Sequence, residues 1–104
     1  MGLLSIFGLG GKSASVKEFM EKGAVVIDVR SYEEFASGHI KGSKNIPLQM
    51  ISGKVAEIKK LNKPVIVCCR SGMRSAQAAS ILKAQNIEVL NGGGWEQLAS
   101  QLLS

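Results

Sequence analysis

The sequence predicts an α/β domain built on a mainly parallel sheet. β-branched runs occupy residues 25–29 and 65–67, and such runs are typical of strands that are covered on both faces. Segments with apolar residues three or four positions apart lie between the strands. Strands that alternate with helices imply βαβ units with right-handed crossovers, and therefore parallel neighbours. The chain of 104 residues suffices for one such domain with one core.

Four strand segments are predicted from apolar or β-branched runs bounded by turn residues. In chain order they are residues 25–29, 44–46, 65–69 and 87–90. Pro47 closes the second strand and Pro64 precedes the third. The glycine-rich residues 91–94 are expected to form a flexible bend after the fourth.

Five helical segments are predicted around these strands. Ser15 is a suitable N-cap for the first, which ends before Gly23, and Ser31 with Glu34 forms a capping box for the second. The spacing of apolar residues predicts the others. The five segments are residues 15–22, 31–37, 52–61, 74–85 and 95–103.

Residues 1–12 are predicted to be a short apolar N-terminal arm or an edge strand, and residues 13–104 the folded domain. The arm has no basic region or cleavage site of a signal peptide, and it is too short to span a bilayer. Ile6 stands where a myristoylation signal needs Ser or Thr.

Composition excludes several classes of function. The net charge of +5 is dispersed, without a basic run, and the chain has only three Phe, one Tyr and one Trp, so we expect no binding to nucleic acid. The positive balance suits a small anionic substrate or an acidic partner. Two adjacent cysteines form no disulfide framework, and one histidine leaves too few ligands for zinc. We therefore expect no metal and a reducing compartment.

The loop that follows the third strand carries the predicted chemistry. Cys69 ends the strand, and the backbone amides of residues 70–75 follow at the start of a helix. Gly72 permits a positive φ, which helps these amides point inward as a nest. Such donors stabilise a thiolate, the reactive form of cysteine. The neighbouring Cys68 points to the opposite face of the strand and is expected to lie in the core.

Hydroxyl and guanidinium donors accompany these amides, and no general base lies near in the sequence. The donors belong to Ser71, Ser75, Arg70 and Arg74. His39, the sole histidine, is expected to be structural. A cysteine activated by donors alone suits sulfur transfer or thiol exchange, and it does not suit amide hydrolysis, which needs a proton for the leaving amine.

Three loops are expected to meet at the carboxyl edge of the sheet, where ligands bind in folds of this kind. They are those that carry Cys69, Arg30 and the 92–94 bend. Asp28 and Arg30 are interpreted as an ion-pairing set that braces this edge, and Trp95 as a core residue at the start of a helix.

Four ordered motifs in the chain resemble those of single-domain rhodaneses, the thiosulfate sulfurtransferase type. They are the segments 27–35, 38–47, 67–75 and 93–95. The resemblance implies a twisted parallel sheet of about five strands flanked by helices on both faces. It also implies that Cys69 is catalytic and accepts sulfane sulfur as a persulfide. Residues 70–75, with Met73 among them, would form the substrate cradle, and Arg70 or Arg74 would attract an anionic donor such as thiosulfate. Asp28 and Arg30 would be structural residues near the site.

Loop length bears on the reaction within this superfamily. Related cell-cycle phosphatases and arsenate reductases have five residues between the cysteine and the arginine, which makes room for a tetrahedral oxyanion. Here only four residues separate Cys69 from Arg74. A shorter cradle favours one transferred sulfur atom over phosphate or arsenate.

The expected function is therefore a cytoplasmic sulfurtransferase. It would move sulfur from thiosulfate or a small persulfide to a thiol or cyanide, without any cofactor beyond the covalent persulfide on Cys69. A persulfide carrier or protein-binding module, with a protein as sulfur donor or acceptor, is the alternative. Phosphatase or arsenate reductase activity is a third, weaker one.

Overall fold

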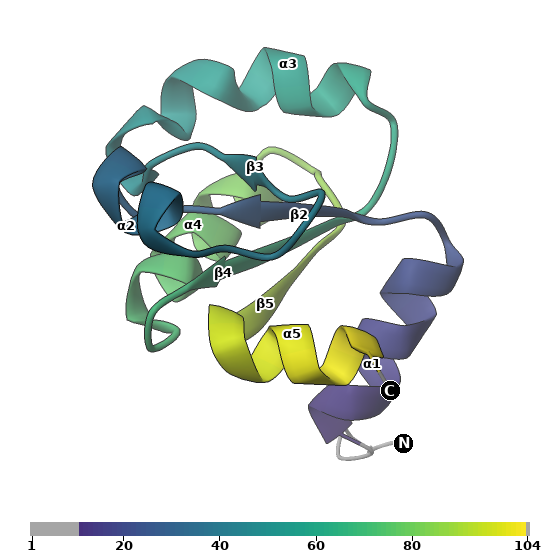
Figure 1. The fold of residues 1–104 in the computed structure, drawn as a ribbon. Coiled ribbons are helices and arrows are strands. Elements are labelled where there is room, and N and C mark those ends of the chain that lie inside the picture. The colour runs from purple at the N-terminus through teal and green to yellow at the C-terminus, as the bar shows by residue number, and fades with distance from the viewer. Residues whose placement is uncertain (1–10, 104) are drawn as a thin grey trace.

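The computed structural model describes residues 11–103, and these residues form alternating helices and strands (Figure 1). The elements in chain order are α1 (Gly11–Glu21), β2 (Val25–Asp28), α2 (Tyr32–Ser37), β3 (Lys44–Asn45), the 3₁₀ turns η1 (Leu48–Met50) and η2 (Ser52–Lys54), α3 (Val55–Lys60), β4 (Val65–Cys69), α4 (Met73–Ala84), β5 (Val89–Gly94) and α5 (Trp95–Leu103).

The strands form one parallel sheet in the order β3-β2-β4-β5, so the predicted fold class is confirmed. The sheet has four strands in the described part of the chain, where about five were expected. An additional edge strand was expected within residues 1–12, and residues 1–10 lie outside the described residues. β4 is central and pairs with β2 and β5, which explains its uniformly apolar sequence.

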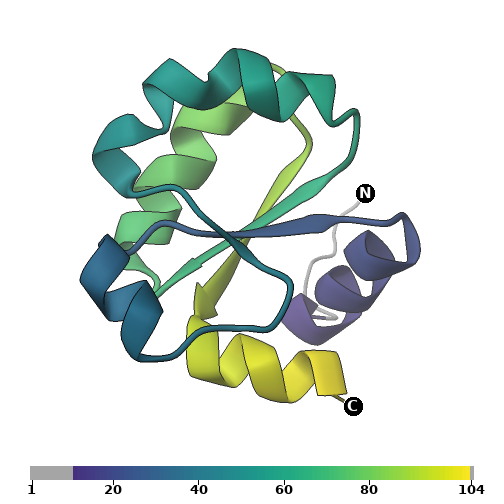
Figure 2. The same ribbon diagram turned by 45° about the horizontal axis from the view of Figure 1, so that its top comes forward.

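Side chains along β4 alternate between two hydrophobic layers. Val65, Val67 and Cys69 pack on the side of α3 and α4, in a core that includes Ile58 and Leu82. The two residues between them, Ile66 and Cys68, pack on the other side against Val16 of α1 and Leu98 of α5. The two views of the ribbon show this division, with α3 and α4 over one face and α1 and α5 over the other (Figures 1 and 2). Helices therefore cover both faces of the sheet, as expected.

Three segments differ from the sequence-based expectation by more than one residue at a boundary. α1 begins at Gly11, so Ser15 lies inside the helix and is not its N-cap. The segment 52–61 starts with a 3₁₀ turn, and its α-helix begins only at Val55, because Gly53 lowers the helix propensity of the first turn. The strand expected at 87–90 starts at Val89 and continues to Gly94. The expected bend is thus strand, and the chain passes directly from β5 into α5.

The carboxyl ends of the parallel strands lie on one edge of the sheet. There α2 follows β2, and α4 follows β4 after a short loop (Figure 1). Glu34 of α2 and Arg74 of α4 form an ion pair across this edge. No helix within residues 11–103 is long and apolar enough to cross a membrane.

Candidate active site

The loop between β4 and α4 closes around the sulfur of Cys69. The Gly72 amide donates a hydrogen bond to Cys69 Sγ at 2.9 Å, and the Ser75 amide donates a longer one at 3.4 Å. Gly72 has a left-handed φ of 101° and stands at the N-cap of α4, so the first turn of the helix points its free amides at the sulfur. Cys69 itself is only 1% exposed. The predicted nest of donors is present in the structure.

These donors control the ionisation of Cys69. Burial by itself raises the pKa of the thiol, because it disfavours the charged form. The hydrogen bonds from the hydroxyl and amide of Ser75, and from the amides of Gly72 and Ser71, outweigh burial, and the net result is a lowered pKa. The surroundings of Cys69 therefore favour the thiolate form of its side chain.

Ser75 connects Cys69 to a residue that the sequence reasoning missed. The Ser75 side chain is fully buried, and its Oγ lies 3.4 Å from Cys69 Sγ. The same Oγ donates a hydrogen bond to Asn91 Oδ1 at 2.7 Å. Asn91 also donates from Nδ2 to the carbonyl of Gly72 at 3.2 Å. Asn91 thus contacts the loop at two points from the neighbouring strand.

A β-bulge brings Asn91 to this position. Val67 pairs with Asn91 whereas Cys68 pairs with Gly93, so Gly92 is an extra residue in β5. A side chain at Gly92 has no room, because its Cβ would lie 2.8 Å from Ile66 Cγ2 and 2.9 Å from Leu98 Cδ2. Bulges of this kind often re-aim a side chain beside a functional site. The only sequence signal for the bulge is the Gly92-Gly93-Gly94 run, which by itself predicts a bend.

Arg74 is already paired within the protein. Its Nη1 lies 2.7 Å from Glu34 Oε1 and its Nη2 lies 3.1 Å from Oε2, a two-point interaction between α4 and α2. Glu34 also accepts from the Ser31 amide, which completes the predicted capping box. Arg74 therefore braces the loop, whereas the side chain of Arg70 is exposed to solvent. The capping pattern identified Glu34, but nothing in the sequence linked it to Arg74.

This ion pair should make stability depend on acidity. Hydrogen bonding to Arg74 and to the Ser31 amide lowers the pKa of Glu34 from 4.5 to about 2. A carboxylate with a lowered pKa stabilises the fold above its unfolded pKa and loses that contribution as the pH falls from 4.5 towards 2. Because water screens a half-buried pair, we expect a loss of about 1 kcal/mol in that window. Denaturant unfolding between pH 2 and 6 measures it.

The variant Glu34→Gln should flatten this pH dependence. Glu57→Gln is the matched control, since Glu57 is exposed and its oxygen lies 3.6 Å from Lys54 Nζ. An unchanged acid transition in Glu34→Gln would contradict the prediction.

Asp28 and Arg30 form a buried ion pair at the end of β2. Arg30 Nε and Nη2 both donate to the Asp28 carboxylate, at 2.8–3.0 Å, and Nη2 also donates to the carbonyl of Gly38. The guanidinium lies 4.8 Å from the ring centre of Trp95. The pair thus ties β2 to the turn after α2 and to the start of α5. Hydrogen bonding to Asp28 raises the pKa of Arg30, so its charge is fixed.

The remaining loop side chains lie at the surface. Arg70 and Ser71 are exposed and line a pocket of about 330 Å³ with Gly94, Glu96 and Gln97. Met73, on the first turn of α4, is 76% exposed. The loop therefore offers its amides to the buried sulfur and its long side chains to solvent.

Two other residues lie where the sequence placed them. Cys68 is buried on the opposite face of β4 from Cys69, where burial first, and then the nearby Asp28, raise the pKa of its thiol to about 12. His39 stacks on Phe35 with ring centres 3.7 Å apart, and its Nδ1 lies 2.8 Å from the Phe35 carbonyl oxygen. Neither contact involves Cys69.

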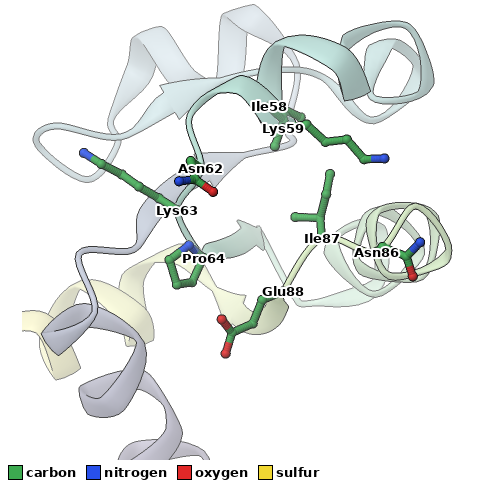
Figure 3. A pocket seen from close by; sticks show the side chains of 8 residues that line it. All are labelled: Ile58, Lys59, Asn62, Lys63, Pro64, Asn86, Ile87 and Glu88. Carbon is green, nitrogen blue, oxygen red and sulfur yellow. The ribbon is translucent and has the colours of Figure 1, made fainter.

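A second pocket lies at the opposite end of the strands. It has a volume of about 260 Å³ and is formed by the end of α3 and by the residues that precede β4 and β5 (Figure 3). Pro64 and Glu88 line it immediately before those strands begin, whereas Cys69 ends β4. This pocket is therefore remote from the thiol. Among residues 11–103, no three His, Cys, Asp or Glu side chains gather as metal ligands.

Comparison with known proteins supports one family. Residues 13–101 match the family model of the rhodanese-like domain. GlpE of Pseudomonas aeruginosa, a thiosulfate sulfurtransferase, is 35% identical over 81 residues, which cover 75% of this chain and 73% of that protein.

Solved structures agree with this match. A structure described as a rhodanese with anions from E. coli superposes with a TM-score of 0.65 at 35% identity, over 70% of this chain and 88% of that one. Reduced CoADR-RHD of Bacillus anthracis superposes with a TM-score of 0.70 at 33% identity, over 88% of this chain. The match covers only 16% of the Bacillus anthracis chain, so the same domain also occurs within a longer protein.

Proposed function

Since the chain belongs to the family of rhodanese-like domains, we propose that it is a sulfurtransferase that uses thiosulfate or a small persulfide as donor, with Cys69 as the residue that carries the sulfur. The observation that carries this proposal is the buried Cys69 sulfur held by the Gly72 and Ser75 amides at 2.9 and 3.4 Å. The pKa of this thiol is lowered although the thiol is buried, so its hydrogen-bond donors activate it as a nucleophile.

The reaction proceeds in two sulfur transfers. The Cys69 thiolate attacks the outer sulfur of thiosulfate, a sulfur–sulfur bond forms, and the sulfur–sulfur bond of thiosulfate breaks. Sulfite leaves with the electron pair of the broken bond, and Cys69 is left as a persulfide. An acceptor thiolate or cyanide then attacks the terminal sulfur, and the Cys69 thiolate leaves with its electron pair. No proton has to be delivered to a leaving group in either step, which agrees with the absence of a base beside Cys69 among the described residues.

Mass measurement tests the proposal directly. The chain incubated with thiosulfate should gain the mass of one sulfur atom, and cyanide should remove it while thiocyanate appears. If the mass increased with none of the three donors, thiosulfate, glutathione persulfide and mercaptopyruvate, the proposal of sulfur transfer would be contradicted. A steady-state comparison of the three donors then identifies the preferred one.

Arg70 is expected to draw the anionic donor to the loop. Its side chain is exposed beside the loop, whereas Arg74 is held by Glu34. Arg70→Ala should raise the KM for thiosulfate about tenfold and weaken the dependence of kcat/KM on salt, since attraction of a charged substrate is screened by ions. Initial rates at several ionic strengths measure both.

Lys63→Ala is the matched control, because Lys63 is an exposed cation beside the pocket at the other end of the sheet. It removes the same net charge without altering the loop. Equal effects of the two variants would show that net charge alone attracts the donor.

A persulfide carrier that serves a protein partner is the second candidate. Met73 is 76% exposed on the first turn of α4, the helix that follows the Cys69 loop, and an exposed apolar side chain there suits contact with another protein. The match within the longer Bacillus anthracis chain agrees with such a role. Turnover of thiosulfate and cyanide at rates usual for enzymes, unchanged in Met73→Ser, would count against it.

The third candidate is a phosphatase or arsenate reductase. The Cys69–Arg74 spacing leaves four residues between the two, and Arg74 is engaged by Glu34. We propose that the loop has no room for a tetrahedral oxyanion, so an aryl phosphate should not be hydrolysed. A free, buried pair of cysteines also suits a reducing compartment, and we propose the cytoplasm.

A further inference from the structure

We propose that Asn91 is a positioning residue for Cys69. While the sulfur is uncharged, Asn91 accepts the hydrogen bond of the Ser75 hydroxyl. When the thiolate forms, the hydroxyl turns and donates this hydrogen bond to the sulfur. This inference rests on the proposed function only in taking Cys69 as the reacting residue. Asn91 reaches the site from β5, a different strand from the one that carries Cys69.

The orientation of the Asn91 amide is fixed by its neighbours. Oδ1 accepts from the Gly93 amide at 2.9 Å, and Nδ2 donates to the Gly72 carbonyl at 3.2 Å. An amide turned by half a rotation would set Nδ2 against an N–H donor and Oδ1 against a carbonyl, so both contacts would become repulsive. The atom that faces Ser75 is therefore the acceptor Oδ1.

Asn91 Oδ1 and Cys69 Sγ compete for the single hydrogen of the Ser75 hydroxyl. The hydroxyl has one proton, and it lies 2.7 Å from Asn91 Oδ1 and 3.4 Å from Cys69 Sγ. When Cys69 is a thiol, the S–H can donate to Ser75 Oγ, whose own proton goes to Asn91. When Cys69 is a thiolate, it accepts only, and the Ser75 proton has two acceptors. Ser75 is 0% exposed, so no bulk water competes for it.

During the catalytic cycle the Ser75 hydroxyl would change its hydrogen-bond acceptor twice. A free thiolate draws the hydroxyl toward Sγ. After sulfur has been transferred, the charge of the persulfide lies on the outer sulfur, Sγ is a poor acceptor, and the hydroxyl returns to Asn91. The hydroxyl thus has an acceptor in each state, which a buried donor needs. Ser75 would otherwise be left unsatisfied whenever Sγ is uncharged.

The other ionisable groups around the site are paired with each other, exposed to solvent or buried on the other face of the sheet. Arg74 is paired with Glu34 of α2, and Asp28 with Arg30 at the end of β2. Cys68 faces the opposite core, and Arg70 is exposed. The side chain of Asn91 forms hydrogen bonds with Ser75, Gly72 and Gly93, so substitution of Asn91 leaves these ion pairs in place.

The test is the pKa of Cys69, measured from the rate of iodoacetamide alkylation against pH. All proteins carry Cys68→Ala, so that only Cys69 reacts. Asn91→Ala should lower the pKa of Cys69 by about one unit, because the hydroxyl then has the thiolate as its sole acceptor. A substitution that merely loosened the loop would weaken the amide donors and raise this pKa.

Asn91→Asp is the second variant and should have the opposite effect. A carboxylate keeps the size of the amide, holds the hydroxyl more strongly and brings a negative charge near the sulfur. The pKa of Cys69 should therefore rise. If Asn91→Ala does not fold, as judged by circular dichroism, the comparison of Asn91→Asp with and without the Ser75 hydroxyl replaces it.

Ser75→Ala supplies the decisive background. If Asn91 acts through the hydroxyl, Asn91→Ala should shift the pKa of Cys69 little in that background, and the rise caused by Asn91→Asp should shrink. An unchanged or raised pKa in folded Asn91→Ala, or equal shifts with and without the Ser75 hydroxyl, would overturn the proposal. No sulfur donor enters the measurement, so its outcome is independent of whether thiosulfate is the substrate.

Discussion

Cys69→Ser is expected to abolish both the gain of one sulfur atom from thiosulfate and the formation of thiocyanate. The serine hydroxyl is not ionised near neutral pH, and the donors that hold the Cys69 thiolate cannot lower its pKa far enough. We expect a residual rate below about one thousandth, because loss of a nucleophile can cost an enzyme up to about a millionfold in kcat. Mass spectrometry and a thiocyanate assay measure the two steps separately.

Cys68→Ala is the control for this substitution. It removes the neighbouring sulfur, whose pKa is raised to about 12 by burial and by Asp28 and which lies in the opposite core. This variant should keep the mass gain and most of the turnover. If a persulfide formed in Cys69→Ser, or failed to form in folded Cys68→Ala, then Cys68 would be the reacting residue and our proposal would be wrong.

Asp28→Ala is expected to have the largest effect on stability. The variant leaves the Arg30 guanidinium buried, 5% exposed, without the carboxylate that accepts two of its N–H groups. Removal of one partner from a buried ion pair costs about 3–5 kcal/mol, since the other charge stays desolvated. Urea unfolding at neutral pH measures the free energy of unfolding of this variant.

Glu88→Ala is the matched comparison, because it breaks an ion pair of the same length at the surface. Lys22 and Glu88 lie 2.8 Å apart, and their side chains are 55% and 52% exposed. Exposed pairs contribute little to stability, because water screens the two charges. If Asp28→Ala cost no more than Glu88→Ala, the bracing role of the buried pair would be wrong.

The sequence predicted the parts of the fold that depend on local pattern. The apolar run of β4, bounded by Pro64, is typical of a strand covered on both faces, and Ser31 with Glu34 forms the capping box that the pattern indicates. The nest around Cys69 followed from a glycine and a helix start after a strand. In each case neighbouring residues carry the whole physical cause.

The parts that it did not predict depend on pairing between distant segments. The sequence predicts that Gly92 belongs to a flexible bend, yet it is the extra residue of a bulge whose position is set by the register with β4. That register brings Asn91 to Ser75, and no periodicity within residues 87–94 encodes it. The pairing of Glu34 with Arg74 spans forty positions in the sequence and arises only once α2 and α4 meet.

The wall of the loop next to α5 is made of main chain. A Cβ at Gly94 would lie 2.8 Å from the carbonyl oxygen of Arg70, so backbone already touches backbone there. Smaller side chains therefore cannot enlarge the space inside the loop on this side. We expect that one residue inserted between Cys69 and Arg74 would press the backbone at Arg70 against Gly94, so the passage from β5 into α5 would have to change as well. Loop length and the glycine run are therefore a single unit of design, and a change of reaction requires both to be altered together.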